Sequence, residues 1–206
     1  MDAQGDRPAP YWKCIVAAAP EAFVGLQFLL VALKKPPLVE ASRHGLTTVM
    51  QAEFLVIHSM AFLGLVALWK PRDAPERRAR ALVFWGLFGL YCLAAASRGL
   101  GHAALFAGLT FVTYLGLFLN WRSESALIQL GARWAVGTAL FLAAIIAFGT
   151  PKNVGEWAGR SSVIAAGAAY FLGLAALELS GLFLRVVPRN AARLAAWLRS
   201  GKRRGA

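Results

Sequence analysis

Hydrophobic residues gather into six long stretches along the chain, and charged residues, prolines and glycines separate them. A bilayer core of about 30 Å is crossed by roughly 20 residues of helix, and each stretch approaches or exceeds that length. The pattern predicts an all-α fold, a polytopic transmembrane helical bundle with six spans. The predicted spans cover residues 14–33, 47–69, 81–98, 103–120, 126–149 and 162–185.

Composition supports a membrane protein. The chain has 206 residues, 58% of them hydrophobic, and a mean hydropathy of +0.56. A soluble core of this size could not bury so much apolar surface. We therefore expect one six-helix transmembrane domain over residues 1–187, followed by a tail over residues 188–206. Cys14 and Cys92 both fall in apolar stretches, so they are interpreted as small core residues and not as a disulfide.

The distribution of basic residues predicts the orientation. Six spans place both termini on one side, where the flanking segments carry 15 Lys and Arg against 6 on the other side. Under the positive-inside rule both termini are cytoplasmic, in a cell inner (plasma) membrane. The formal charge of +12 therefore indicates contact with anionic lipid on the cytoplasmic face, and no nucleic acid is expected as a partner.

The tail after Pro188 has the pattern of a basic amphipathic helix lying on the inner leaflet. Leu194, Trp197 and Leu198 would dip into the membrane while arginines meet lipid phosphates. Such a helix serves as an interfacial anchor or recruits a partner, and the sequence leaves both open. Glycine- and alanine-rich faces in the spans allow close helix packing, and they are equally compatible with a homo-oligomer or with a subunit of a membrane complex.

Two charges lie at matching depth in the last two spans. At about 1.5 Å per residue, Arg133 and Glu178 each sit roughly 7 Å to the cytoplasmic side of the midplane. Because hydrocarbon tolerates charges that are paired, the simplest arrangement is an Arg133–Glu178 ion pair. This pair acts either as a structural strut or as part of a functional site.

Glu53 lies in the outer half of the second span, roughly 7–8 Å beyond the midplane. The nearest counter-charge along the predicted topology is Arg98, at the outer end of the third span. Its long side chain could reach inward, so a Glu53–Arg98 pair is expected.

Glu21, near the centre of the first span, has no obvious partner. It follows Pro20, which frees a backbone carbonyl one turn earlier and favours a kink. A carboxylate beside a kink at mid-membrane depth is typical of an ion or substrate site, although a hydrogen bond across the bundle would also satisfy it.

His58, near the centre of the second span, also lacks an obvious partner. At 100° per residue His58 and Glu53 lie on faces rotated by roughly 140°, so this span is polar on two sides and should be central in the bundle. Three interpretations remain open for His58: a satisfied core imidazole, a proton-relay group, or a ligand of haem or chlorin.

No catalytic motif marks the chain as an enzyme. Nucleophile-elbow, P-loop, HExxH and CxxCH patterns are absent, and no metal site is expected. A haem held by two histidines is disfavoured because His44 and His102 lie about 15 Å from His58 in depth. We expect no cofactor, with haem or quinone at His58 as the alternative.

Three functions fit these features. The favoured hypothesis is translocation of protons or of a small cation or solute, through Glu21, Glu53, His58, Arg133 and Glu178. The alternative is a redox or cofactor-binding membrane subunit that uses His58 for haem, chlorin or quinone. The third is a structural accessory subunit of a membrane complex.

Overall fold

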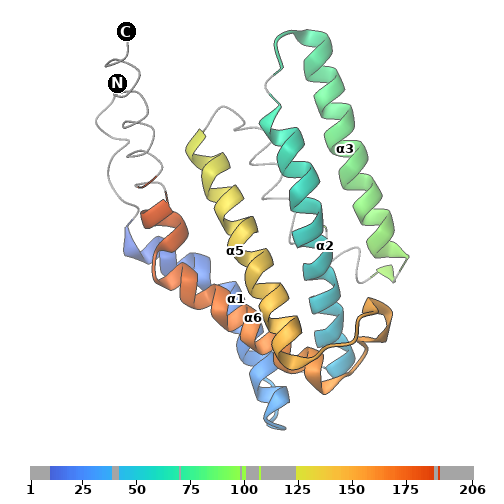
Figure 1. The fold of residues 1–206 in the computed structure, drawn as a ribbon, viewed down its shortest axis with the longest axis vertical. Coiled ribbons are helices and arrows are strands. Elements are labelled where there is room, and N and C mark those ends of the chain that lie inside the picture. Colours follow the sequence, from blue (N-terminus) through green and yellow to red (C-terminus); the bar gives the residue numbers. More distant parts are fainter. Residues whose placement is uncertain are drawn as a thin grey trace.

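The computed structural model describes residues 10–38, 42–69, 71–97, 99–100, 107, 124–187 and 190, and its regular structure over these residues is entirely helical (Figure 1). This confirms the all-helical fold class. The elements are α1 (Tyr11–Ala32), α2 (Arg43–Leu68), α3 (Ala74–Ala96), α5 (Glu124–Phe148), the 3₁₀ turn η2 (Val154–Glu156), α6 (Ser161–Leu179) and the π-helical turn η3 (Leu182–Val186).

In the part of the chain that the structure describes, five helices are long and apolar enough to cross a membrane. They are α1, α2, α3, α5 and α6, with qualifying segments of 19 to 24 residues. They correspond to five of the six predicted spans. The remaining span, over residues 103–120, lies almost entirely outside the described residues, as does the tail over 188–206.

Helix bounds agree with the apolar stretches to about one turn, except in α3 and α6. Helix α3 begins at Ala74 and not at 81, because the Asp73 side chain accepts a hydrogen bond from the Glu76 backbone N–H at 2.8 Å and caps the helix ahead of its apolar part. Helix α6 ends at Leu179 and not at 185, because Gly181 adopts a left-handed conformation with φ of 76°.

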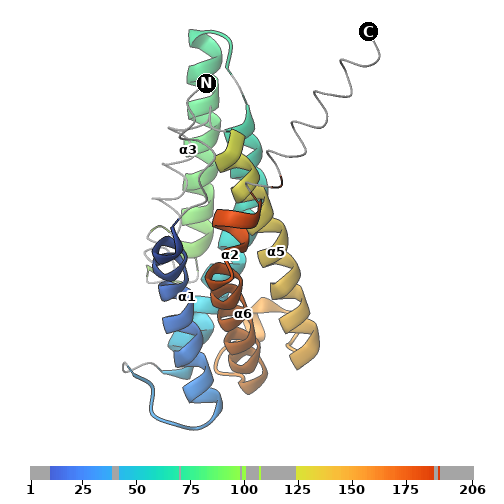
Figure 2. The same cartoon turned by 90° about the vertical axis from the view of Figure 1, so that its left-hand side faces the viewer.

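The helices form two neighbouring groups, α1 with α6 and α2 with α3, and α5 contacts both groups. Helices α1 and α6 lie side by side, α5 packs on α6, and α2 packs between α3 and α5 (Figures 1 and 2). The sequence placed the second span centrally, and the contacts of α2 with α3, α5 and α6 confirm this. We call the end of the bundle at the α2–α3 turn the Asp73 end, and the opposite end, where α5 ends and α6 begins, the Trp157 end.

Helices α1 and α6 approach closely because glycines face the partner helix. A Cβ atom built on Gly25 would lie 2.8 Å from the Leu172 backbone nitrogen, and one built on Gly167 would lie 2.3 Å from the Phe28 ring. Phe28 is fully buried and stacks on Phe171 with ring centroids 5.5 Å apart. Small residues thus let two helices from opposite ends of the chain meet, as is common in membrane bundles.

We expect Gly25→Ala to destabilise the protein by about 1–3 kcal/mol, because its methyl group would push against the α6 backbone. Thermal unfolding in detergent should show a lower Tm. The matched control is Gly86→Ala on α3, where a Cβ would meet no described residue within 4 Å. That control should hold or raise the Tm, since alanine is favoured over glycine in helices by roughly 0.5–1 kcal/mol. Equal Tm values for the two variants would contradict the close α1–α6 contact.

Candidate functional site

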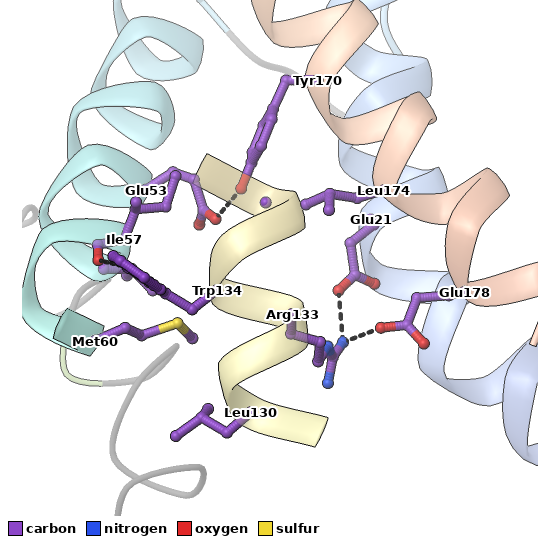
Figure 3. A pocket seen from close by; sticks show the side chains of 12 residues that line it. Glu21, Glu53, Ile57, Met60, Leu130, Arg133, Trp134, Tyr170, Leu174 and Glu178 are labelled. Atoms are coloured by element: carbon purple, nitrogen blue, oxygen red, sulfur yellow. Dashed lines mark hydrogen bonds and ion pairs between the residues drawn. The ribbon is translucent and has the colours of Figure 1, made fainter. Parts of the chain in front are cut away.

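A cavity of about 170 Å³ lies between α2, α5 and α6, and α1 contributes one side chain to it (Figure 3). Four of the five residues singled out from the sequence reach it; His58 does not. The lining residues are Glu21, Glu53, Val56, Ile57, Met60, Leu130, Arg133, Trp134, Gly137, Tyr170, Leu174 and Glu178.

The spacing of the lining residues follows helix geometry. Helix α2 contributes positions 53, 56, 57 and 60, and α5 contributes positions 130, 133, 134 and 137. Each set has the spacing i, i+3, i+4 and i+7, which places its members on one face of a helix. The lining residues of α6 recur every four positions, at 170, 174 and 178. Three helices therefore turn one face each toward the cavity.

Arg133 joins three helices at one side of the cavity. Its Nη2 atom forms an ion pair with Glu178 of α6 and lies 3.5 Å from Oε1 of Glu21 of α1 (Figure 3). The guanidinium also lies over the Phe183 ring of η3, with Cζ 5.8 Å from the ring centroid. The Arg133–Glu178 pair predicted from depth is confirmed, whereas the expectation that Glu21 lacks a partner was wrong.

The three charged side chains differ in exposure. Arg133 is 43% exposed, Glu21 is 22% exposed and Glu178 only 2%. The Oε2 atoms of Glu21 and Glu178 are buried and have no hydrogen-bond partner among the described residues. Because a buried acceptor without a partner is costly, these two atoms are places where water, a proton or a ligand would be stabilised.

Glu53 occupies the opposite side of the cavity. The Tyr170 hydroxyl of α6 donates a hydrogen bond of 2.6 Å to its Oε1 atom. The expected counter-charge Arg98 lies outside the described residues, so the Glu53–Arg98 pairing stays a prediction. Among the described residues no cation forms an ion pair with Glu53, in contrast to Glu21 and Glu178.

Trp134 and Gly137 shape the α5 side of the cavity. The Trp134 ring spans toward α2, where its Nε1 donates a hydrogen bond of 3.0 Å to the Ile57 carbonyl. Gly137 is one turn further along the same face, and a Cβ there would lie 3.9 Å from the Tyr170 hydroxyl. The missing side chain at 137 leaves open the space between the Glu53 and Arg133 groups.

An aromatic layer closes the bundle between the cavity and the Trp157 end. The rings of Phe141 and Tyr170 meet edge to face at 5.2 Å, and Trp157 lies 6.2 Å from Phe141 and 6.3 Å from Phe54. Trp157 is 3% exposed, and its Nε1 donates to the Pro151 carbonyl at 3.0 Å. The exposed side of the cavity is therefore the one bearing Arg133.

His58 lies on another face of α2, toward α3. Its Nδ1 is 2.9 Å from the Tyr91 hydroxyl, and the rings of Phe54 and Phe62 flank the imidazole at 6.2 and 5.4 Å. The imidazole is exposed on this side. The structure thus gives His58 a partner that the sequence did not indicate, and separates it from the four charged residues of the cavity.

Charge balance defines what the cavity can bind. It holds three carboxylates and one guanidinium, so full ionisation leaves two uncompensated negative charges in an apolar bundle. Among the described residues no three His, Cys, Asp or Glu side chains converge in a way that could hold a metal ion. The arrangement favours protons or a cation that needs few oxygen ligands.

Trp134 and Tyr170 both line the cavity, and neither is among the candidate site residues predicted from the sequence. The i, i+3, i+4, i+7 spacing that links Trp134 to Arg133 and Gly137 was a usable signal. The role of Tyr170 as a hydrogen-bond donor could not be predicted, because an uncharged donor does not stand out among the apolar residues of a span.

Comparison of the chain with models of known protein families, with curated proteins and with solved structures gave no match.

We expect Arg133→Met to lower the stability by about 3 kcal/mol, the lower end for breaking a buried pair, because Arg133 is 43% exposed while Glu178 is nearly inaccessible. The double variant Arg133→Met, Glu178→Gln should regain more than half of that loss, since the unpaired buried charge is removed. A double-mutant cycle from thermal unfolding in detergent measures this, with exposed Lys152→Met as the control. No recovery in the double variant would contradict the pairing.

Proposed function

We propose that this protein translocates protons or a small cation across a cell inner membrane through the cavity between α2, α5 and α6. The observation that carries the proposal is a cavity lined by three carboxylates and a single guanidinium, within helices long and apolar enough to span a bilayer. Ionisable groups inside a membrane bundle are costly and typically mark ion or substrate pathways.

The size of the cavity fits this role. A cavity needs roughly 10–15 Å³ to hold one water molecule, so about 170 Å³ has room for several. The buried Oε2 atoms of Glu21 and Glu178 provide acceptors for such waters or for a proton. A hydrogen-bonded path of waters between the Arg133 side and Glu53 would pass Gly137, which has no side chain, and the neighbouring Tyr170 hydroxyl.

Access from one side is also typical of a transporter. Arg133 is exposed, while the layer of Phe54, Phe141, Trp157 and Tyr170 closes the Trp157 end. In this proposal the Asp73 end faces the cytoplasm, in line with the excess of Lys and Arg in the segments that the sequence predicts to be cytoplasmic. In this proposal the Arg133 side is the entrance, and the aromatic layer is the barrier that a solute has to cross.

In proteoliposomes we expect the parent protein to dissipate an imposed pH gradient or to admit labelled methylammonium. Glu53→Gln and Glu21→Gln should each lower the transported flux at least tenfold, because each removes a negative charge from the pathway. Flux is measured with an enclosed pH-sensitive dye and by uptake of the labelled amine.

The control for these variants is Glu156→Gln, which neutralises an exposed carboxylate in η2 and should leave the flux unchanged. Parent flux equal to that of empty liposomes for both solutes would contradict translocation. Full flux in both cavity variants would exclude this cavity as the pathway.

A second candidate function uses His58, and one observation favours it. The Tyr91 hydroxyl engages Nδ1, which orients the imidazole and directs Nε2 away from α3's tyrosine. A partner on the far ring nitrogen is the usual support for a histidine that ligates a metal or hydrogen-bonds a redox group. The flanking rings of Phe54 and Phe62 would suit the plane of a haem or a quinone.

For this candidate, the purified protein should show a Soret absorbance band or carry extractable quinone. His58→Ala should reduce the bound amount at least tenfold, whereas Glu53→Gln should leave it intact because Glu53 faces the cavity on the other side of α2. A colourless, quinone-free preparation would argue against a cofactor at His58.

A further inference from the structure

We infer that the cavity binds a small organic monocation, a primary amine whose ammonium group meets Glu53 and whose apolar body lies against Trp134. This inference rests on the proposed function, since it names the class of cation that enters the pathway. Four features carry it: an unbalanced carboxylate, the chemistry of the walls, the cavity volume and a fixed aromatic ring.

The carboxylate at Glu53 lacks a cation. Arg133 is already engaged with Glu21 and Glu178, and the only described partner of Glu53 is the neutral Tyr170 hydroxyl on Oε1. No described residue is hydrogen-bonded to its Oε2 atom. An ionised carboxylate at this depth requires a positive partner, and a ligand that enters the cavity can supply it.

The apolar part of the cavity lining favours an organic cation over an inorganic one. Met60, Leu130 and Leu174 are apolar, and Figure 3 shows Met60 and Leu130 on the same side as the Trp134 ring. A hard metal ion needs about six oxygen ligands, whereas the described residues contain no convergent set of three metal-binding side chains. An ammonium group is satisfied by a carboxylate, a hydroxyl and a ring face.

The volume sets the size of the ligand. An apolar cavity of about 150 Å³ is known to bind benzene, which has six heavy atoms. The cavity here measures about 170 Å³ and ends at a carboxylate. A six-membered ring bearing an aminomethyl group, with eight heavy atoms, therefore matches both the space and the charge.

Trp134 provides a preformed surface for such a ligand. The hydrogen bond from its Nε1 to the Ile57 carbonyl holds the indole across the gap between α5 and α2. A tryptophan face attracts cations, and a ring whose position is already fixed loses little freedom on binding. The same ring offers an apolar face to the body of the ligand.

The test is calorimetric titration of the purified full-length chain in detergent with two isosteric probes, benzylammonium and benzyl alcohol. Both have a benzyl body, and only the first carries a charge. We expect saturable 1:1 binding of benzylammonium, at least tenfold tighter than any binding of benzyl alcohol after subtraction of protein-free micelles. Equal affinity for the two probes, or no binding of benzylammonium, would overturn the inference.

Two variants locate the binding. Glu53→Gln should weaken benzylammonium at least tenfold and leave benzyl alcohol unaffected. Gly137→Leu should abolish binding of both by filling the cavity, while its control Gly86→Leu, at a position that meets no neighbour, should bind as the parent does. Each variant is compared only after its thermal transition shows that it is folded, and Gly137→Leu decides the question if Glu53→Gln unfolds. Unchanged affinity in a folded cavity variant would overturn the proposal.

The outcomes separate this inference from the proposed function. Flux of protons in liposomes without amine binding would remove the organic ligand and keep translocation. Binding at Glu53 without flux of any kind would keep the site and remove translocation.

Discussion

The guanidinium of Arg133 is the constraint on which the rest of the bundle depends. It lies between Glu178 of α6 and Glu21 of α1, so one side chain of α5 fixes the lateral positions of three helices. An unpaired charge is costly inside an apolar bundle, and Glu178, only 2% exposed, depends on the guanidinium more than Glu21, which is 22% exposed. The close α1–α6 contact at Gly25 and Gly167 brings the two carboxylates near each other, so one cation can serve both.

The depth of each charged residue in the membrane could be predicted from the sequence, whereas the lateral arrangement of the helices could not. Counting residues along each span placed Arg133 and Glu178 at the same level, and their pairing followed because both lie on consecutive spans. Glu21 was placed nearer the midplane and on the first span, which gave no reason to connect it with the fifth. The first and last described spanning helices are neighbours because of close packing at glycines, and a single sequence does not reveal which glycine faces which helix.

At Glu53 and His58 the structure differs from the prediction because the partners of both residues are uncharged. The counter-charge predicted for Glu53 was Arg98, while its described partner is the Tyr170 hydroxyl. No partner was predicted for His58, although the Tyr91 hydroxyl lies within hydrogen-bond distance of its Nδ1. Both tyrosines look like ordinary packing residues in a hydrophobic stretch, because their rings suit the apolar interior and only their hydroxyl groups seek a partner. The two-sided polarity of α2, by contrast, depends only on helix periodicity, and it placed this helix correctly between its neighbours.

Helix geometry also explains why one side of the cavity holds a cation and the other side does not. Tyr170 and Glu178 are eight residues apart on α6, a rise of about 12 Å, so the hydroxyl that holds Glu53 and the carboxylate that pairs with Arg133 lie at different levels. A guanidinium committed to Glu21 and Glu178 cannot also form a direct ion pair with a carboxylate held at the level of Tyr170. Among the described residues Glu53 therefore has the Tyr170 hydroxyl as its partner and no direct ion pair, and it faces the same cavity as Gly137 and Trp134.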